Sequence, residues 1–259
     1  MTSVLKKTLN NQKLKWWIPA IVGILVILVI SSLALLQEDT SSFAASTAEV
    51  VIIDQLEGSY PNQTFKILIT ELVGDSKLDV DYYQHDEITV DLFRNLLRNE
   101  YRLIILRMHA ATGEAMGQPS LLSLFTGEPY SKNKHIWEQL NNQVGRVRVD
   151  VESDSFFGIY PRFVFQEMKG SCTNATVVMM GCDGLTSTEM ADSFIEKGAK
   201  AYVGWNGPVI AEYVDRATTQ FLTYIMVENW SIETAVNQVM KTIGPDPVFG
   251  SILSAYYKD

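Results

Sequence analysis

Apolar and polar residues alternate along most of the chain in blocks that predict strands and helices in turn. In the first half, short apolar runs predict strands over residues 50–54, 78–83 and 102–108. Between them, apolar residues recur every three to four positions over 62–73 and 89–99, which predicts two helices. This alternation is typical of an α/β fold whose sheet is mostly parallel and is flanked by helices.

Strand and helix patterns alternate again in the last third of the chain. Strands are expected over 175–181 and 199–204, and the capping-box pattern Thr186–Glu189 predicts the start of another helix. Three further helices are expected over 211–228, over 231–243 and in the tail to residue 259. Together with the first half, these elements predict one α/β domain over residues 49–259.

The segment between residues 110 and 170 breaks this rhythm and contains several glycines. The expected pieces are strand-like runs at 120–125 and 146–151, a helix at 134–141, a turn at 156–161 and a helix from Pro161 to about Met168. We expect this insert to hold a hairpin near the carboxyl edge of the sheet.

The longest apolar run lies near the N-terminus. Residues 18–36 form an uncharged, almost wholly apolar run of 19 residues. At about 1.5 Å per residue, a helix of this length spans roughly 28 Å, close to the thickness of a hydrocarbon core. Trp16 and Trp17 precede the run, where an aromatic belt is expected. The pattern predicts a transmembrane signal anchor over residues 16–36.

Charges on either side of this anchor predict its orientation. Four lysines lie within residues 1–15, and Glu38 and Asp39 follow the apolar run. The positive-inside rule then places residues 1–15 in the cytoplasm, residues 37–48 as a spacer, and the domain on the outside of the cell membrane. A cleavable signal peptide is the alternative, although its apolar region is usually about 7–15 residues long. Small residues at 44–46 would then be the cleavage site, and the protein would be secreted.

The part of the chain that follows the anchor is strongly acidic. It holds all 30 acidic residues, and the 21 basic residues less the four N-terminal lysines leave 17, for a net charge of −13. Nucleic-acid partners require a basic face, so none is expected. The charge is typical of a solvated acidic exterior, and it also permits a cationic substrate.

Two cysteines in an exported domain raise the question of a disulfide. Cys172 precedes the strand expected over 175–181 and Cys182 follows it, so an extended strand would hold them on the order of 20–30 Å apart. A disulfide needs Cα atoms within about 7 Å. Two free thiols are therefore expected.

Two of the predicted strands, 102–108 and 175–181, end next to chemically useful residues, His109 and Cys182. In open α/β sheets, sites form at the carboxyl ends of the strands. An imidazole placed there can take the proton of a thiol and later deliver it to a leaving amine. The structural alternative is an inert thiol, because free cysteine is among the most buried residue types.

Neighbouring residues add weaker signals. Gly181 and Gly184 would let a substrate backbone approach, and the N–H groups around Cys182 would offer an oxyanion hole. Glu114 and Asp183 are candidates to receive a basic substrate side chain, although most such acids are simply solvated. No spacing typical of a metal site and no glycine-rich phosphate loop occurs, so no cofactor is expected.

The sequence around both strand ends resembles that of the caspase-like (clan CD) cysteine peptidases, which include caspases, gingipains and CHAT domains. The segments that carry the resemblance are the strand ending at His109, the block 177–185 around Cys182, and the helix and strand over 191–205. The resemblance covers roughly residues 49–243 and is greater to CHAT- and gingipain-type members.

This resemblance implies a three-layer caspase-like domain, a His109–Cys182 dyad, and substrate contacts near Trp205 and Asn206. The family usually has a glycine after the histidine, and the N–H of that glycine often contributes to the oxyanion hole; this chain has Ala110 at that position, which the resemblance makes an oxyanion candidate. We therefore expect a membrane-anchored, outward-facing cysteine endopeptidase that acts on a peptide or protein substrate. The alternative is a catalytically inactive relative that binds a peptide or partner at the same edge. An α/β hydrolase is disfavoured because the Gly-x-Ser-x-Gly elbow is absent.

Overall fold

The computed structural model describes residues 47–75, 78–113 and 121–257. The predicted membrane anchor over 16–36, its flanking segments and the candidate residue Glu114 lie outside the described residues. Within the described ranges, no helix is long and apolar enough to cross a membrane.

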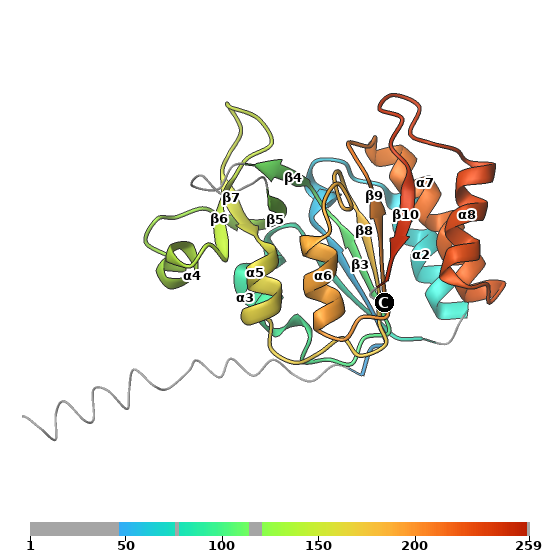
Figure 1. The fold of residues 1–259 in the computed structure, drawn as a ribbon, viewed down its shortest axis with the longest axis horizontal. Coiled ribbons are helices and arrows are strands. Elements are labelled where there is room, and N and C mark those ends of the chain that lie inside the picture. The colour runs from blue at the N-terminus through green and yellow to red at the C-terminus, as the bar shows by residue number, and fades with distance from the viewer. Residues whose placement is uncertain (1–46, 76–77, 114–120, 258–259) are drawn as a thin grey trace, which may run out of the picture. The chain divides into compact units, whose positions relative to one another are not determined.

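A six-stranded sheet forms the centre of the domain (Figure 1). Its strands are β1 (Val50–Asp54), β2 (Val80–Gln84), β3 (Leu103–Arg107), β8 (Thr176–Met180), β9 (Ala201–Trp205) and β10 (Leu253–Tyr256). Their spatial order is β10-β9-β8-β3-β1-β2. All neighbouring pairs are parallel except β10 and β9, which are antiparallel. The expected mostly parallel sheet is confirmed.

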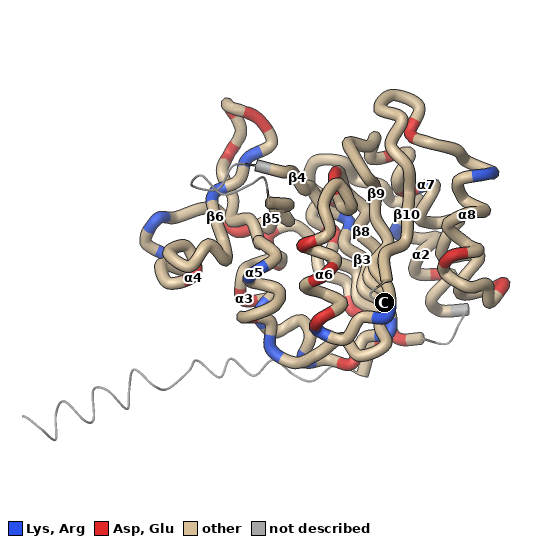
Figure 2. The backbone as a smooth tube through the Cα atoms, viewed as in Figure 1, with Lys and Arg blue, Asp and Glu red and all other residues tan. Residues whose placement is uncertain are grey.

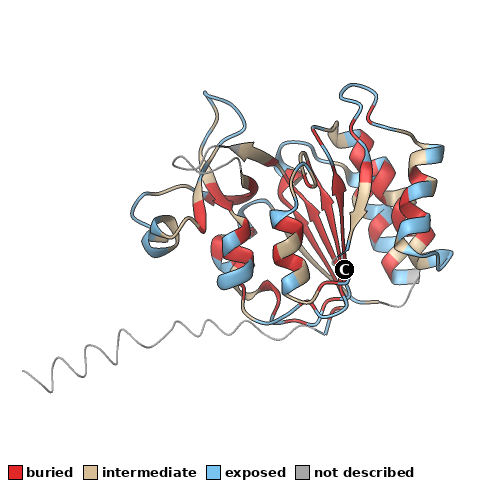
Figure 3. Cartoon of the chain, in the orientation of Figure 1, coloured by how far each residue is buried: buried red, intermediate tan, exposed pale blue. Residues whose placement is uncertain are grey.

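Four of these strands are buried along their whole length (Figure 3). Every residue of β1, β3, β8 and β9 is buried. A nearly continuous apolar run is what a parallel strand needs when both faces of its sheet are covered. Charged residues lie mainly on the helices and loops (Figure 2), and the exceptions in these four strands are Asp54 and Arg107, which end β1 and β3.

Helices cover both faces of the sheet, so the domain has three layers (Figure 1). One face is covered by α3 (Val90–Leu96), α5 (Pro161–Gln166) and α6 (Glu189–Glu196), and the other by α2 (Gln63–Asp75), α7 (Ala211–Leu222) and α8 (Ile232–Thr242). Successive strand residues point into the two cores in turn, as Ile104 and Ile105 do. The α/β class with a sheet between helices is confirmed.

A second sheet, which is antiparallel, lies within the segment between residues 110 and 170. Its strands are β4 (Ala110–Gly113), β5 (Leu121–Pro129), β7 (Phe156–Ile159) and β6 (Val144–Val147), in that spatial order, and α4 (Ile136–Leu140) precedes β6. The turn predicted at 156–161 is wrong, because Phe157 is fully buried and β7 pairs with both β5 and β6. A Cβ added to Gly158 would lie 2.1 Å from the Ser123 Oγ, so only glycine fits there.

Two predictions for the C-terminal part also need correction. The tail forms β10 instead of a helix, because Leu253 packs in the core and the segment pairs with β9. The helix expected over 211–228 is α-helical only to Leu222 and continues as a π-helix, η3 (Thr223–Val227).

Candidate active site

His109 and Cys182 follow two neighbouring strands of the central sheet at matching positions. The parallel strands β3 and β8 pair in register up to their last residues. The two segments remain in close contact one residue beyond the strands. A Cβ added to Gly181 would lie 2.3 Å from the carbonyl oxygen of Met108. This close approach requires a glycine at position 181. The residues that follow Met108 and Gly181 are His109 and Cys182.

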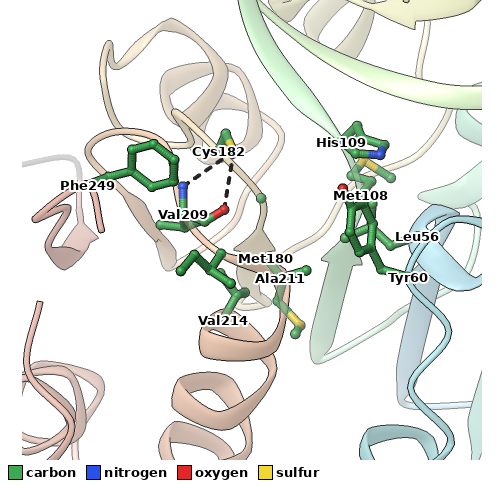
Figure 4. A pocket seen from close by; sticks show the side chains of 12 residues that line it. Leu56, Tyr60, Met108, His109, Met180, Cys182, Val209, Ala211, Val214 and Phe249 are labelled. Atoms are coloured by element: carbon green, nitrogen blue, oxygen red, sulfur yellow. Dashed lines mark hydrogen bonds between the residues drawn. The ribbon is translucent and has the colours of Figure 1, made fainter. Parts of the chain in front are cut away.

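A cavity of about 330 Å³ opens at this edge of the sheet (Figure 4). His109 lies on one side of the cavity and Cys182 on the other. The lining residues are Leu56, Tyr60, Met108, His109, Met180, Gly181, Cys182, Val209, Ile210, Ala211, Val214 and Phe249. A site was predicted at the carboxyl ends of these strands, and both dyad candidates line this cavity.

The loop after β1 positions His109. The side-chain oxygen of Gln55 accepts a hydrogen bond from the His109 N–H at 2.9 Å, and the Ser59 Oγ lies 3.4 Å from the His109 Nε2. The Tyr60 ring packs edge-on against the imidazole at 5.8 Å, and the Phe125 ring lies at 6.0 Å. Burial lowers the pKa of His109 below its ordinary value. The imidazole is therefore neutral at pH 7 and can accept a proton.

The thiol of Cys182 is held by the loop before α7. The Val209 N–H donates to the Cys182 Sγ at 3.5 Å, and the thiol lies 3.8 Å from the Val209 carbonyl oxygen, to which it donates (Figure 4). Burial raises the pKa of Cys182, and the negative charges of Asp183 and Asp246 raise it further. Among the described contacts of His109 and Cys182, no hydrogen bond joins the two side chains. The resting site therefore holds a neutral thiol and a neutral imidazole.

The Ala110 N–H is not paired with the partner strand β5, and Ala110 is not among the residues that line the cavity. The Phe125 N–H donates to the His109 carbonyl, so Ala110 and Leu124 face each other as a pair that exchanges no backbone hydrogen bonds. The Ala110 N–H thus points away from β5, on the free edge of the second sheet. The φ angle of Ala110 is not positive, so this position does not require a glycine.

Gly184 has a packing role that the sequence did not indicate. A Cβ at this position would lie 3.0 Å from the Met179 Cγ and 3.5 Å from the Gly204 Cα. Gly184 is buried, and its missing side chain makes room for β8 and β9 rather than for a substrate. No backbone carbonyl of the described residues accepts a hydrogen bond from the Cys182 N–H, which faces its own thiol group.

Three further candidates do not line the cavity. Trp205 is fully buried among the core residues on the α7 side of the sheet, so its side chain offers no substrate surface. The side-chain oxygen of Asn206 accepts from the Ile252 N–H and ties β9 to the segment before β10. The Asp183 carboxylate accepts from the Thr186 hydroxyl within its own turn.

Arg107, Asp54 and Asp215 form a buried ion cluster next to the cavity, and the two acidic partners of Arg107 were not identified from the sequence. The Arg107 Nη1 lies 2.7 Å from the Asp54 Oδ1, and its Nε lies 2.7 Å from the Asp215 Oδ1. A further donor, Nη2, bonds both the Asp215 Oδ2 and the carbonyl oxygen of Tyr60. All three side chains are buried. An arginine inside an apolar strand was the available signal, because a buried cation requires acidic partners.

This cluster connects the core to the site. Through the Tyr60 carbonyl it fixes the loop that packs against His109, and Asp215 follows Val214, which lines the cavity. The pKa of Arg107 is raised by its hydrogen bonds to Asp215 and by the charges of Asp54 and Asp215, which outweigh the opposite effect of burial. The guanidinium of Arg107 is therefore held as a buried cation by its two acidic partners.

Comparison with protein-family models and a search of curated proteins both find no match. Among the described residues, no group of three or more His, Cys, Asp or Glu side chains is placed to hold a metal ion.

Alkylation of Cys182 is expected to accelerate with pH through pH 9 and beyond. The pKa of Cys182 is raised above its ordinary value of 9.0, so the reactive thiolate is scarce at neutral pH. A preformed thiolate–imidazolium pair would instead give a rate that is already constant from about pH 5. The rate of iodoacetamide labelling of the full chain, followed by mass spectrometry across this range, measures the difference.

Cys172 provides the internal reference for this measurement. It is 1% exposed, and burial raises its pKa to about 11. It should stay unlabelled while Cys182 reacts. Equal labelling of the two cysteines, or a plateau at acidic pH, would contradict the environments described above.

Proposed function

We propose that the chain is a cysteine endopeptidase of the caspase-like type, with Cys182 as nucleophile and His109 as general base and acid. The observation that carries the proposal is the meeting of these two residues at one cavity, each directly after a neighbouring parallel strand. The alternation of strand and helix up to the strand that precedes His109 agrees with the resemblance noted in the sequence.

The site residues supply each step of amide hydrolysis. As Cys182 Sγ attacks the scissile carbonyl carbon, its proton passes to the neutral imidazole of His109. The carbonyl oxygen becomes an oxyanion that the N–H groups of Ala110 and Cys182 stabilise. The C–N bond then breaks as His109 returns the proton to the leaving amine. A water molecule, deprotonated by His109, finally hydrolyses the thioester and releases the free thiol.

For this reaction, the Cys182 Sγ and the His109 imidazole must come closer together than they are in the free protein. The thiol is bound to Val209 rather than to His109, so substrate binding has to turn Sγ toward the imidazole. Catalytic hydrogen bonds are often long or unformed in the free enzyme and shorten only in the substrate complex. The same observation favours the second candidate, a domain that binds peptides at this edge without cleaving them.

We further propose that the predicted anchor over residues 16–36 holds the enzyme in the cell membrane with its domain outside. Its substrates are then peptides or proteins of the exterior. The acidic net charge of the part after the anchor gives no basic face for nucleic acid.

Digestion of a peptide library by the full chain tests the function. We expect cleavage at defined bonds, detected by mass spectrometry, and complete loss of cleavage after Cys182 is alkylated. Saturable peptide binding without any turnover would instead establish the binding domain. Cleavage that survives alkylation would rule out the thiol as nucleophile.

A further inference from the structure

The cavity between His109 and Cys182 has an almost entirely apolar wall. Leu56, Met108, Met180, Val209, Ile210 and Val214 supply this wall. Apart from His109 and Cys182, the only polar side chain among the twelve lining residues is the Tyr60 phenol. Tyr60 is 52% exposed and therefore lies at the mouth rather than in the depth of the cavity.

Among the residues that the structure describes, no charged side chain lines this cavity. The charged groups beside the cavity are engaged within the protein. Asp183 accepts a hydrogen bond from Thr186, Asp246 accepts from backbone N–H groups, and the Arg107 cluster is closed off by its own hydrogen bonds. Asp54 accepts from Tyr82 as well as from Arg107, and Asp215 accepts from Asn62 as well as from Arg107. A charged substrate side chain entering the cavity would lose its hydration and gain no partner, whereas an apolar one gains from burial.

The wall and the rim of the cavity are fixed by one buried carboxylate. Asp246 is 2% exposed and accepts hydrogen bonds from the N–H groups of Ile210, Val248 and Phe249, at 2.9 Å each. Ile210 is part of the wall, while Phe249 is 55% exposed at the rim. The apolar surface is therefore already assembled in the free protein.

The volume sets the size of what can enter. Cavities of about 150 Å³ bind benzene, so about 330 Å³ accommodates a leucine, methionine or phenylalanine side chain. A peptide whose scissile carbonyl lies between Cys182 and His109 places the side chain of that same residue at the cavity entrance.

We propose that this cavity receives an uncharged, apolar side chain, such as that of Leu, Met or Phe, from the substrate residue that precedes the cleaved bond. The proposal rests on the proposed peptidase function. It replaces the expectation that Asp183 binds a basic side chain at this position, since Asp183 does not line the cavity. The same expectation for Glu114 stays a prediction, because Glu114 lies outside the described residues.

Peptides that differ only at this residue test the specificity. With the full chain, kcat/KM for Leu, Met or Phe should exceed that for Lys, Arg, Asp or Glu by at least about tenfold. A difference in apolar side-chain contact within a pocket commonly gives discrimination of at least this size. Equal or faster cleavage after a basic residue would overturn the proposal.

Peptidyl chloromethyl ketones separate this proposal from the peptidase function. Reagents ending in Leu or Phe should label Cys182 faster than one ending in Lys, even if no peptide is turned over, because labelling needs only binding beside the thiol. Small-molecule alkylation by iodoacetamide corrects for intrinsic thiol reactivity. Failure to cleave any peptide would thus count against the peptidase, whereas absence of a labelling preference would count against the apolar cavity.

Ala211→Leu tests the position of the cavity. Ala211 is half-buried at the start of α7 and lines the cavity, so a leucine there takes up part of its volume. Cleavage after Phe or Met should fall at least about tenfold while cleavage after Ala is retained. Glu212→Leu is the matched control, because it adds the same side chain at the next, exposed position outside the cavity. An equal loss for all peptides in Ala211→Leu would contradict the assignment.

Discussion

Cys182→Ala is expected to lower peptide cleavage by the full chain by at least about 10⁴-fold, because the nucleophile is removed. His109→Ala should cost about 10²–10⁴-fold, the usual contribution of a general acid and base. The second loss follows from the raised pKa of Cys182, which leaves the thiol protonated unless His109 takes the proton. Measured kcat/KM values on the best library peptide provide the comparison.

Cys172→Ala is the matched control for this pair of variants. Cys172 is free, buried before β8 and absent from the cavity, so its replacement should leave cleavage unchanged. Circular dichroism and thermal unfolding would show that all three variants are folded. Full activity in His109→Ala would exclude the dyad and require a different base.

Arg107→Met is expected to lower the free energy of unfolding by about 3–5 kcal/mol. The substitution leaves Asp54 and Asp215 buried side by side without their common counter-ion. It also removes the donor to the Tyr60 carbonyl, so the loop against His109 loses its attachment. Urea unfolding of the full chain, followed by fluorescence, measures the effect.

Arg102→Met is the control for the loss of an arginine. Its guanidinium pairs with Glu49 at 3.0 Å, but the Arg102 side chain is 72% exposed, so about 1 kcal/mol or less is expected. Adding Asp54→Asn and Asp215→Asn to Arg107→Met should recover part of the lost stability, since no unpaired charge then remains. Similar losses for Arg102→Met and Arg107→Met would show that the buried pairing is unimportant.

The central sheet could be predicted because each parallel strand has a nearly continuous apolar sequence. The first strand was placed at the same residues, 50–54, that form β1. The site followed from the same pattern, since parallel strands deliver the residues that follow them to one edge. His109 and Cys182 were therefore predictable at the same edge of the sheet without any knowledge of the residues between them.

The parts that were missed depend on pairing between distant segments. The strands β4, β7 and β10 are four residues each, too short to show a period, and they form because a partner strand accepts them. Trp205 was misplaced for another reason. A position at a strand end does not say which face a side chain takes, and Trp205 shares its face with Val203 in the core.

The partners of Arg107 show a related limit. Asp54 lies 53 positions away and Asp215 lies 108 positions away, and neither stands out locally. The apolar strand around Arg107 indicates that this arginine has an acidic partner. Which acids pair with it is known only from the fold.

The Arg107 cluster also constrains how this chain can change over evolutionary time. Loss of any one of Arg107, Asp54 or Asp215 exposes the others to the cost of an uncompensated buried charge, so single substitutions at these positions are selected against. Descendants should retain the three together or replace them together with apolar residues. Co-variation of positions 54, 107 and 215 would therefore mark relatives that share this architecture, even where the residues of the cavity have diverged to accept other side chains.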